Sequence, residues 1–230
     1  MINRVSKYQI ATSVAILFHI IGTTGILFFD KDFFIRSTPF NLLLMFALLV
    51  WTQKEKNKYF VLFLAVSFIA GIGVEIIGVN TSLLFGEYQY GAVLGPRVMN
   101  VPWIIGINWF IIIYCCGISV NKLLTKVSSR ATATGADTPK IMKLLSIIVD
   151  GATLAVFFDW LMEPVAINLK YWHWNGNGEV PFFNYFCWFI ISILLLTVFH
   201  FCKFEKRNKF AVNLLLIQVM FFLLLRTFMN

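Results

Sequence analysis

The sequence predicts an all-α, polytopic integral membrane protein with about seven transmembrane helices and its N-terminus in the cytoplasm. Hydrophobic residues occupy 59% of the 230 positions and charged residues only 13%, whereas a soluble domain carries roughly 25% charged residues. The mean hydropathy is +0.80, and apolar stretches near the roughly 20 residues that cross a bilayer recur along the whole chain. These observations exclude an ordinary soluble protein and favour one transmembrane domain over residues 1–230.

Seven apolar stretches supply the predicted helices in order. They cover residues 8–29, 39–52, 59–79, 101–120, 141–165, 181–202 and 210–228. The first follows Arg4 and Lys7 as a signal peptide would, but its apolar run is too long and lacks a small-residue cleavage site. We therefore expect a retained helix there. The second stretch is short, and it is kept because dropping it would break the alternation of basic and less basic loops.

Basic residues indicate the orientation of these helices. Seven spans place 14 of the 19 Lys and Arg residues on the side of the N-terminus. The other side holds Lys31, Arg36, Arg97, Lys170 and Arg226. Because cytoplasmic loops carry the excess of basic residues, we expect the N-terminus inside and the C-terminus outside, in the cell inner (plasma) membrane. The net charge of +8 comes from short loops without a continuous basic face, so no nucleic-acid partner is predicted.

A weak internal repeat links the middle of the chain to its later part. Val101-Pro102 is followed after six residues by Trp109-Phe110, and Val180-Pro181 is followed after six residues by Trp188-Phe189. In both places a proline opens a predicted helix, where its missing N–H costs nothing. Duplication would relate residues 59–120 to residues 141–202, and chance recurrence in so aromatic a chain is the alternative.

Four acids lie inside the predicted spans, namely Glu75, Asp150, Asp159 and Glu163. A carboxylate in the bilayer is costly and suggests function. Glu75, Asp159 and Glu163 fall near the outer ends of spans three and five, so they can meet. Asp159 and Glu163 are four residues apart on one helical face, and carboxyls that close tend to share a proton. The alternative is a set of hydrated carboxyls at helix ends.

Two neighbours of these acids have a structural interpretation. Asp150 lies about half a turn around the helix from Asp159, and we expect it to pair with a base on the inner side. Pro164 directly follows Glu163, which predicts a kink or a helix end there.

Two aromatic loops follow the acid-bearing spans. The first contains Tyr88 and Tyr90, and the second contains Trp172 and Trp174. Aromatic residues at this depth often form the anchoring belt of a membrane protein. Around a buried acid, their faces can also stabilise a developing cation. The residues thus describe an apolar pocket with a proton donor, a second carboxyl and walls that suit a cation.

Several other classes of membrane protein lack their required residues here. His19, His173 and His200 are too few and too scattered for a di-iron site. The last span has no lysine for a retinal Schiff base. The four cysteines Cys115, Cys116, Cys187 and Cys202 lie in or beside apolar stretches without metal-site spacing. Asp159 and Glu163 faintly resemble a prenyltransferase acidic motif, but the motif stands alone. We therefore predict no metal and no cofactor.

The ordered acids, glycines and aromatic residues resemble the carotenoid biosynthesis membrane proteins, of the bisanhydrobacterioruberin hydratase and bacterial carotenoid hydratase type. In the first half, the matching residues are Glu75, Gly78, Thr81, Phe85, Gly86, Tyr88, Tyr90, Leu94, Gly95, Pro96, Val101, Pro102, Trp109 and Phe110. In the second half, they are Asp159, Glu163, Pro164, Tyr171, Trp172, Trp174, Pro181, Asn184, Trp188 and Phe189. The resemblance covers residues 71–188, roughly half of the chain.

The resemblance implies an enzyme that hydrates the terminal double bond of an acyclic (ψ) carotenoid end group by acid catalysis. Protonation would give a tertiary carbocation, and water would convert it into a tertiary alcohol without a redox cofactor. Our hypothesis makes Asp159 the proton donor, while Glu163 or Glu75 orients and deprotonates the water. The carotenoid substrate would come from the lipid phase, among membrane lipids. A carotenoid end-group cyclase, or a non-catalytic carotenoid-binding or transport protein, is the alternative, and the oligomeric state is left open.

Further residues are predicted to contact the substrate. They are Tyr88, Tyr90, Arg97, Trp109, Trp172, Trp174, Asn184 and Trp188. For each aromatic residue in the loops, anchoring at the membrane interface is the competing role. Arg97 is expected either to close the site as a counter-charge to Glu75 or Glu87, or to be a solvated residue of an outer loop.

Overall fold

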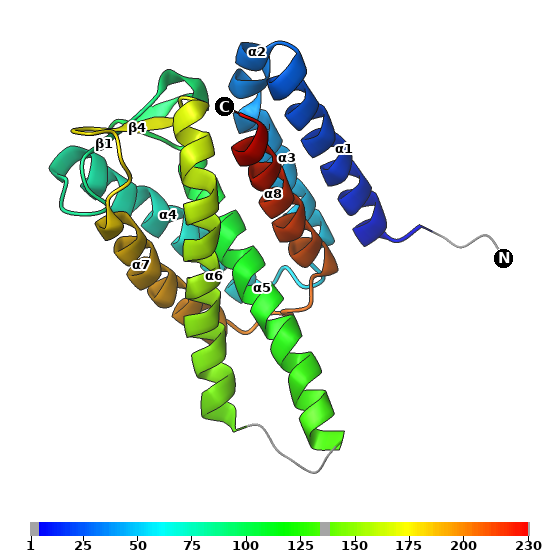
Figure 1. Cartoon of the computed structure of the whole chain (residues 1–230). Coiled ribbons are helices and arrows are strands. Elements are labelled where there is room, and N and C mark those ends of the chain that lie inside the picture. The colour runs from blue at the N-terminus through cyan, green and yellow to red at the C-terminus, as the bar shows by residue number, and fades with distance from the viewer. Residues whose placement is uncertain (1–4, 134–138, 230) are drawn as a thin grey trace.

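A computed structural model describes residues 5–133 and 139–229 of the chain, and within them it is built almost entirely of helices (Figure 1). The helices are α1 Lys7–Phe28, α2 Lys31–Arg36, α3 Thr38–Thr52, α4 Lys58–Thr81, α5 Ile104–Ala133, α6 Lys140–Asn168, α7 Phe182–Phe201 and α8 Lys209–Phe228. The short strands are β1 Tyr88–Tyr90, β2 Arg97–Val98, β3 Val101–Pro102 and β4 Trp172–Trp174, and Ala92–Leu94 forms one 3₁₀ turn. The predicted all-α fold is confirmed.

Six of the described helices, α1 and α4 to α8, are long and apolar enough to cross a membrane. The remaining predicted span, the second along the chain, is α3, whose 15 residues cover only about 22 Å at 1.5 Å per residue. Its ends nevertheless lie on opposite sides of the bundle. Thr38 bonds the Tyr171 hydroxyl on the side of the strands, and Gln53, just after α3, bonds the Glu205 backbone on the other side. The predicted alternation of seven helices is therefore preserved.

Polar side chains define where several helices begin. The Ser6 hydroxyl accepts from the Gln9 N–H, and the Gln9 side chain accepts from the Ser6 N–H, which forms a capping box at the start of α1. Asn57 caps α4, and Asn208 caps α8, each through its side-chain oxygen. These three caps lie on the N-terminal side of the membrane domain.

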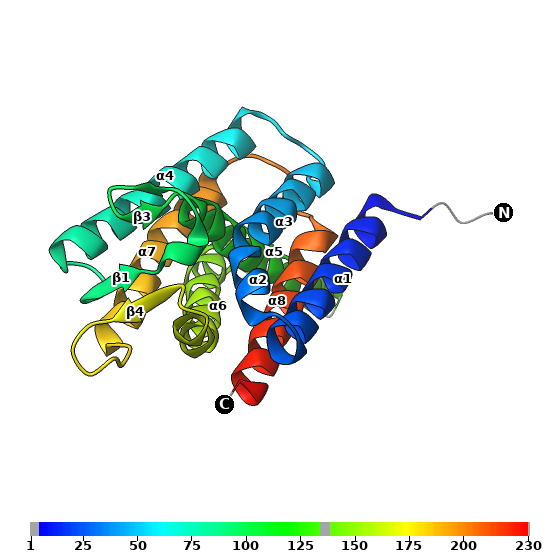
Figure 2. The same cartoon turned by 90° about the horizontal axis from the view of Figure 1, so that it is seen from above.

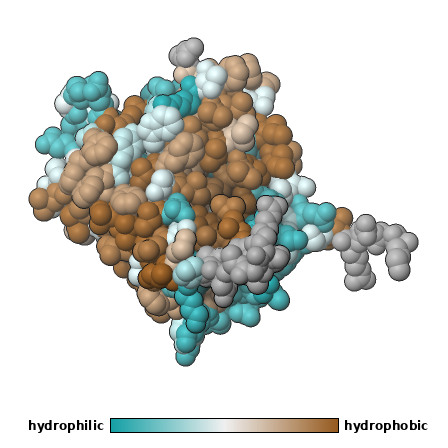
Figure 3. Space-filling model, turned by 60° about the horizontal axis from the view of Figure 1, so that its bottom comes forward, coloured by the Kyte–Doolittle hydropathy of each residue, from teal (hydrophilic) through white to brown (hydrophobic). Residues whose placement is uncertain are grey.

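The long helix α5 occupies the centre of the bundle, in contact with α3, α4, α6, α7 and α8 (Figure 1). It is deeply buried because neighbours surround its apolar part. On the outside, large hydrophobic residues such as Phe40, Ile69 and Phe182 stay exposed. Figure 3 shows a broad hydrophobic surface with hydrophilic residues gathered toward its margins. Such a surface suits lipid, as expected for a multi-pass membrane protein.

Pro164 lies inside α6 and does not end it, because the helix continues to Asn168. A proline cannot donate to the carbonyl four residues earlier, here that of Trp160. Arg226 of α8 donates to this carbonyl at 3.2 Å, and its guanidinium lies 4.1 Å from the centre of the Trp160 ring. Of the predicted kink or helix end, the helix end is therefore not seen, and Arg226 supplies a donor to the carbonyl that the proline leaves free.

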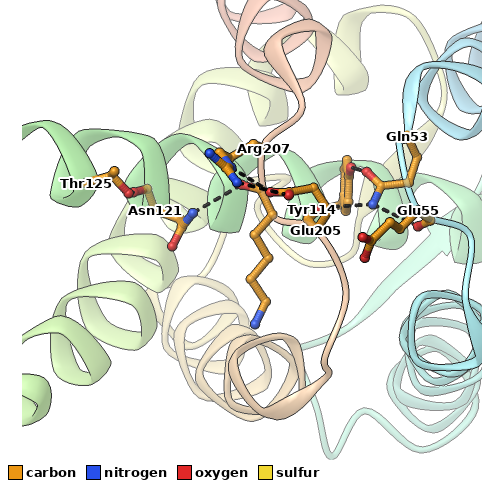
Figure 4. Close-up of polar contacts among 8 residues, drawn as sticks. Gln53, Glu55, Tyr114, Asn121, Thr125, Glu205 and Arg207 are labelled. Atoms are coloured by element: carbon orange, nitrogen blue, oxygen red, sulfur yellow. Dashed lines mark hydrogen bonds and ion pairs between the residues drawn. The ribbon is translucent and has the colours of Figure 1, made fainter.

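A buried polar cluster joins the two short loops on the N-terminal side (Figure 4). The Gln53 amide donates to the backbone oxygens of Glu55 and Glu205, at 3.1 and 2.9 Å. The Tyr114 hydroxyl donates to Gln53 Oε1 at 2.5 Å, and Asn208 Nδ2 donates to the Tyr114 oxygen at 3.2 Å. One side chain of the loop after α3 thereby fixes the loop before α8 and the central helix.

Replacing Gln53 should destabilise the fold. In Gln53→Leu, the Tyr114 hydroxyl and two backbone oxygens lose their partner, and a buried group without a partner costs about 1–3 kcal/mol. The midpoint of thermal unfolding in detergent should fall clearly below that of the wild type. Glu55→Ala is the control, because only the Glu55 backbone takes part. Equal midpoints for Gln53→Leu and the wild type would contradict this account.

On the opposite side, the two aromatic loops pair with each other as an antiparallel ribbon (Figure 2). Tyr88 lies opposite Trp174, and Tyr90 lies opposite Trp172. The ribbon is continued by Gly91, whose N–H donates to the Tyr171 oxygen at 2.7 Å. β2 and β3 form a second small hairpin beside it. The ribbon thus joins the end of α4 to the end of α6.

The close approach at Gly91 allows a direct test of this ribbon. A Cβ atom at Gly91 would lie 2.0 Å from the Lys170 backbone oxygen, so Gly91→Ala must push the strands apart. We expect a lower midpoint of thermal unfolding. Gly73→Ala is the matched control, because among the described residues beyond its own stretch of α4 no heavy atom lies within 4 Å of its added Cβ, and alanine favours a helix by about 1 kcal/mol. Unchanged thermal unfolding of Gly91→Ala would refute the tight crossing.

Candidate active site

The three outer acids meet beneath the β1–β4 ribbon. Glu75 comes from α4, while Asp159 and Glu163 come from successive turns of α6, and their exposed fractions are 5%, 1% and 2%. They line one cavity of about 30 Å³. Because a water molecule needs about 10–15 Å³ of such space, the cavity has room for a water beside the carboxyls. The predicted meeting of these acids is confirmed, whereas their chemical roles remain predictions.

Glu75 is surrounded by hydrogen-bond donors. The hydroxyls of Tyr88 and Tyr90 both donate to its Oε2, the second at 2.6 Å, and Trp109 Nε1 donates to its Oε1 at 2.9 Å. Burial, and then the negative charge of Glu75, raises the pKa of Tyr88 and of Tyr90 above the ordinary value, so both keep their protons. Three donors on two oxygens make this the environment of a carboxylate.

Glu163 has a similar environment in the second half of the chain. Trp172 Nε1 and Trp174 Nε1 donate to its Oε2 at 2.9 and 3.0 Å. An indole N–H can only donate, so this oxygen has no room for a proton of its own. Asn184 Nδ2 approaches the other oxygen at 3.4 Å. Glu163 is therefore also placed as a hydrogen-bond acceptor.

Asp159 differs from both glutamates. Its Oδ2 accepts from Asn184 Nδ2 at 2.8 Å, but its Oδ1 is buried without a hydrogen-bond partner among the described residues. This oxygen is therefore available to hold a proton. Because Asn184 contacts Asp159 and Glu163 together, one amide links the acid that has a free oxygen to the carboxylate next to it.

The two halves of the site resemble each other. Each glutamate receives two donors from the aromatic strand that follows it, and the strands pair antiparallel with Gln89 opposite His173 at the centre. Trp109 and Trp188, the corresponding residues of the predicted repeat, stack with ring centroids 3.9 Å apart and 13° between planes. This arrangement agrees with the repeat of residues 59–120 and 141–202, whose origin by duplication stays a prediction.

The resemblance between the halves ends at one position. Four residues before Glu163 is Asp159, whereas four residues before Glu75 is Gly71. A Cβ at Gly71 would lie 2.6 Å from the Cβ and Cγ atoms of Trp109, so glycine permits this tryptophan to pack against α4 and reach Glu75. The first half thus holds a carboxylate alone, and the second half holds a carboxylate with an additional acid.

Two predicted ion pairs, one of Arg97 and one of Asp150, are not formed among the described residues. The Arg97 guanidinium donates to the backbone oxygens of Tyr90 and Gly91, at 2.9 and 2.5 Å, instead of pairing with Glu75 or Glu87. Arg97 therefore holds the end of β1 and stays exposed. Of its two expected roles, the counter-charge to a site carboxyl was wrong, and the exposed position in a loop agrees with the other. Asp150 accepts from the Ser146 hydroxyl at 2.6 Å in place of the expected base.

The remaining predicted contact residues do line the cavity. They are Tyr88, Tyr90, Trp109, Trp172, Trp174, Asn184 and Trp188. The sequence analysis missed Asn108, which faces the same cavity from α5. The sequence signal for this residue is a polar amide within an apolar span, directly before Trp109. Phe85, Ile105 and Met162 add apolar wall and carry no such signal.

The fold and this site define a multi-pass α-helical membrane protein with three carboxyls buried under an aromatic ribbon. The sequence pattern of the family described as carotenoid biosynthesis protein matches residues 38–230, and the chain belongs to this family. The resemblance seen in the sequence is thereby confirmed.

One relative in this comparison is bisanhydrobacterioruberin hydratase of Haloarcula japonica, which is 25% identical over 130 residues. The alignment covers 56% of this chain and 41% of that protein, so the chain matches less than half of the relative's length. No solved structure matches the chain.

Proposed function

We propose that this protein is a carotenoid hydratase of the inner (plasma) membrane that needs no cofactor. It would add water to the terminal double bond of an acyclic (ψ) end group and form a tertiary alcohol. The family and the name of the 25% identical relative support a carotenoid substrate. The single observation that carries the reaction type is Asp159. One of its oxygens has no partner among the described residues, and it lines the same cavity as two donor-bound carboxylates.

Protonation of the alkene is the first step. Asp159 transfers its proton to the CH carbon of the terminal double bond, and the π electrons form the new C–H bond. The positive charge then rests on the carbon that carries two methyl groups. Glu75 and Glu163 lie near this charge, and the faces of the aromatic side chains in the walls stabilise it further. Asp159 is left as a carboxylate.

Capture of the cation by water completes the reaction. A lone pair of the water oxygen forms the C–O bond, and the proton that water loses passes to Glu163. Glu163 can return this proton to Asp159, because the two carboxyls lie one helical turn apart and line the same cavity. The sum is one water added to one double bond, with no change of oxidation level that a redox cofactor would have to balance.

Product analysis tests this proposal against its alternatives. The chain would be expressed in a bacterial host that accumulates lycopene, and the extracted pigments would be compared by chromatography and mass spectrometry. We expect a pigment that is heavier by one water. An isomer of unchanged mass would identify a cyclase, in which a neighbouring alkene captures the cation. Unaltered pigment, with the protein demonstrated in the membrane, would favour binding or transport.

A further inference from the structure

A second cavity adjoins the acid cavity on the side of α1, α3 and α8. It measures about 70 Å³ and shares four lining residues with the acid cavity, namely Ile105, Asn108, Met162 and Trp172. Two of these four side chains have polar atoms, namely Asn108 and Trp172. The Trp172 indole N–H already donates to Glu163, so Asn108 carries the polar group that is still available. The Asn108 side chain therefore lies where the two cavities meet.

The second cavity is lined by residues whose acceptor atoms receive no hydrogen bond from the described part of the chain. Gln218 of α8 has an exposed fraction of 5%, and its Oε1 has no partner among the described residues. The Oδ1 atom of Asn41 on α3 is also buried without a hydrogen-bond partner among the described residues. His19 donates from Nδ1 to the Ala15 oxygen at 2.7 Å, which leaves Nε2 of the neutral ring as a third acceptor. All three residues line this cavity.

These acceptors fit water better than any part of a hydrocarbon. A buried amide oxygen without a partner costs free energy, and a polyene in contact with it would leave that cost in place. Water supplies two O–H donors, and a cavity of about 70 Å³ exceeds several times the space that one water needs. A water that donates both hydrogens to protein oxygens keeps a lone pair free to attack a cation.

We propose that this second cavity is the binding subsite for the water consumed in hydration. Gln218 and Asn41 hold the water, and Asn108 passes it to the cation in the acid cavity. The inference rests on the proposed hydratase function and deepens it. The acid cavity of about 30 Å³ is small, and an alkene end that enters it displaces the water it can hold, so the attacking water needs a neighbouring site. Without it, the cation would return a proton to Asp159 and the alkene would form again.

The test follows both fates of the cation in the same reaction. Membranes that carry the wild type, Gln218→Leu or Asn41→Leu are supplied with lycopene in deuterated buffer. The hydrated product and the deuterium content of recovered lycopene are then measured by mass spectrometry. A deuteron from Asp159 adds to the CH carbon, and loss of a proton from the cation leaves an alkene that carries deuterium. The two measurements therefore separate protonation from water capture.

We expect the leucine variants to form at least about tenfold less product, as for loss of one well-placed polar contact, while deuterium still enters recovered lycopene. The ratio of deuterated lycopene to product should therefore rise in each variant. This ratio does not depend on how much folded protein the membrane contains, so poor expression cannot imitate the result. If product and deuterium uptake fall together, or if hydration is unchanged, the water subsite is refuted.

Two control variants show the ratio expected without any effect on the water subsite and the result expected when protonation itself is lost. Ser192→Ala removes a buried hydroxyl that also lacks a partner among the described residues, but Ser192 lies in α7 outside both cavities, and its ratio should equal that of the wild type. Asp159→Asn should abolish product and deuterium uptake alike. A wild type that forms no hydrated pigment would instead reject the hydratase function, and the water subsite with it.

Discussion

Asp159→Asn should abolish hydration while the protein remains folded in the membrane. The amide cannot supply the proton that the alkene needs, yet it is nearly the same size and can still accept from Asn184. Removal of a general acid costs roughly 10²–10⁴-fold in rate. We therefore expect the hydrated pigment to fall below detection in cells that accumulate lycopene, and the rate in isolated membranes to fall by at least about 100-fold.

The same helix provides a matched control for this variant. Asp150→Asn changes an acid that is exposed and bonded to Ser146, outside the acid cavity. Its activity should stay within about a factor of two of the wild type, because Asp150 does not line the acid cavity. The fold should also be kept, since surface changes away from such sites usually alter stability by no more than about 0.5 kcal/mol. Full activity of Asp159→Asn would reject Asp159 as the proton donor, whatever the product proves to be.

Glu163→Gln should produce the second large loss of activity, again by about 100-fold or more. The glutamine oxygen can still accept from the indoles of Trp172 and Trp174, so the ribbon keeps its contact with α6. It cannot take up the proton that water loses on attack. We expect a lower kcat with a nearly unchanged KM, measured as product formation in membranes over a range of substrate concentrations.

An exposed acid in the loop between β4 and α7 controls for the change of charge. Glu179→Gln alters a residue bonded to Asn177 at the outer surface, and it should leave kcat unchanged. A structural role for Glu163 would show as a lower midpoint of thermal unfolding together with a higher KM. If Glu163→Gln keeps wild-type kcat, the proton from water must go elsewhere, and Glu75 would become the candidate.

The comparison of the two halves adds weight to these predictions. Glu75 and Glu163 occupy corresponding places, and each is bound by donors from its own aromatic strand. Asp159 has no counterpart, because Gly71 stands at the corresponding position and admits Trp109. Asp159 is therefore the acid of the three with an oxygen that receives no hydrogen bond from the described residues.

The sequence alone determined the class of the protein, its spans, their alternation and the acids of the site. Hydropathy and loop charge are summed over neighbouring residues, so they can be read without the fold. An ionisable residue inside an apolar span is conspicuous for the same reason. These local signals located Glu75, Asp159 and Glu163 together with the two aromatic loops beside them, and the family resemblance added Asn184.

Only the tertiary structure decided which carboxyl oxygen lacks a partner among the described residues, and which of the alternatives left open for Arg97 and Pro164 fails. Arg97 bonds backbone oxygens at the end of β1, and Arg226 bonds the carbonyl that Pro164 leaves free. The grouping of Asn41, Asn108 and Gln218 was equally hidden, because three different helices carry them. Hydrogen-bond partners depend on the packing of helices far apart in the chain, and no local pattern of residues records that packing.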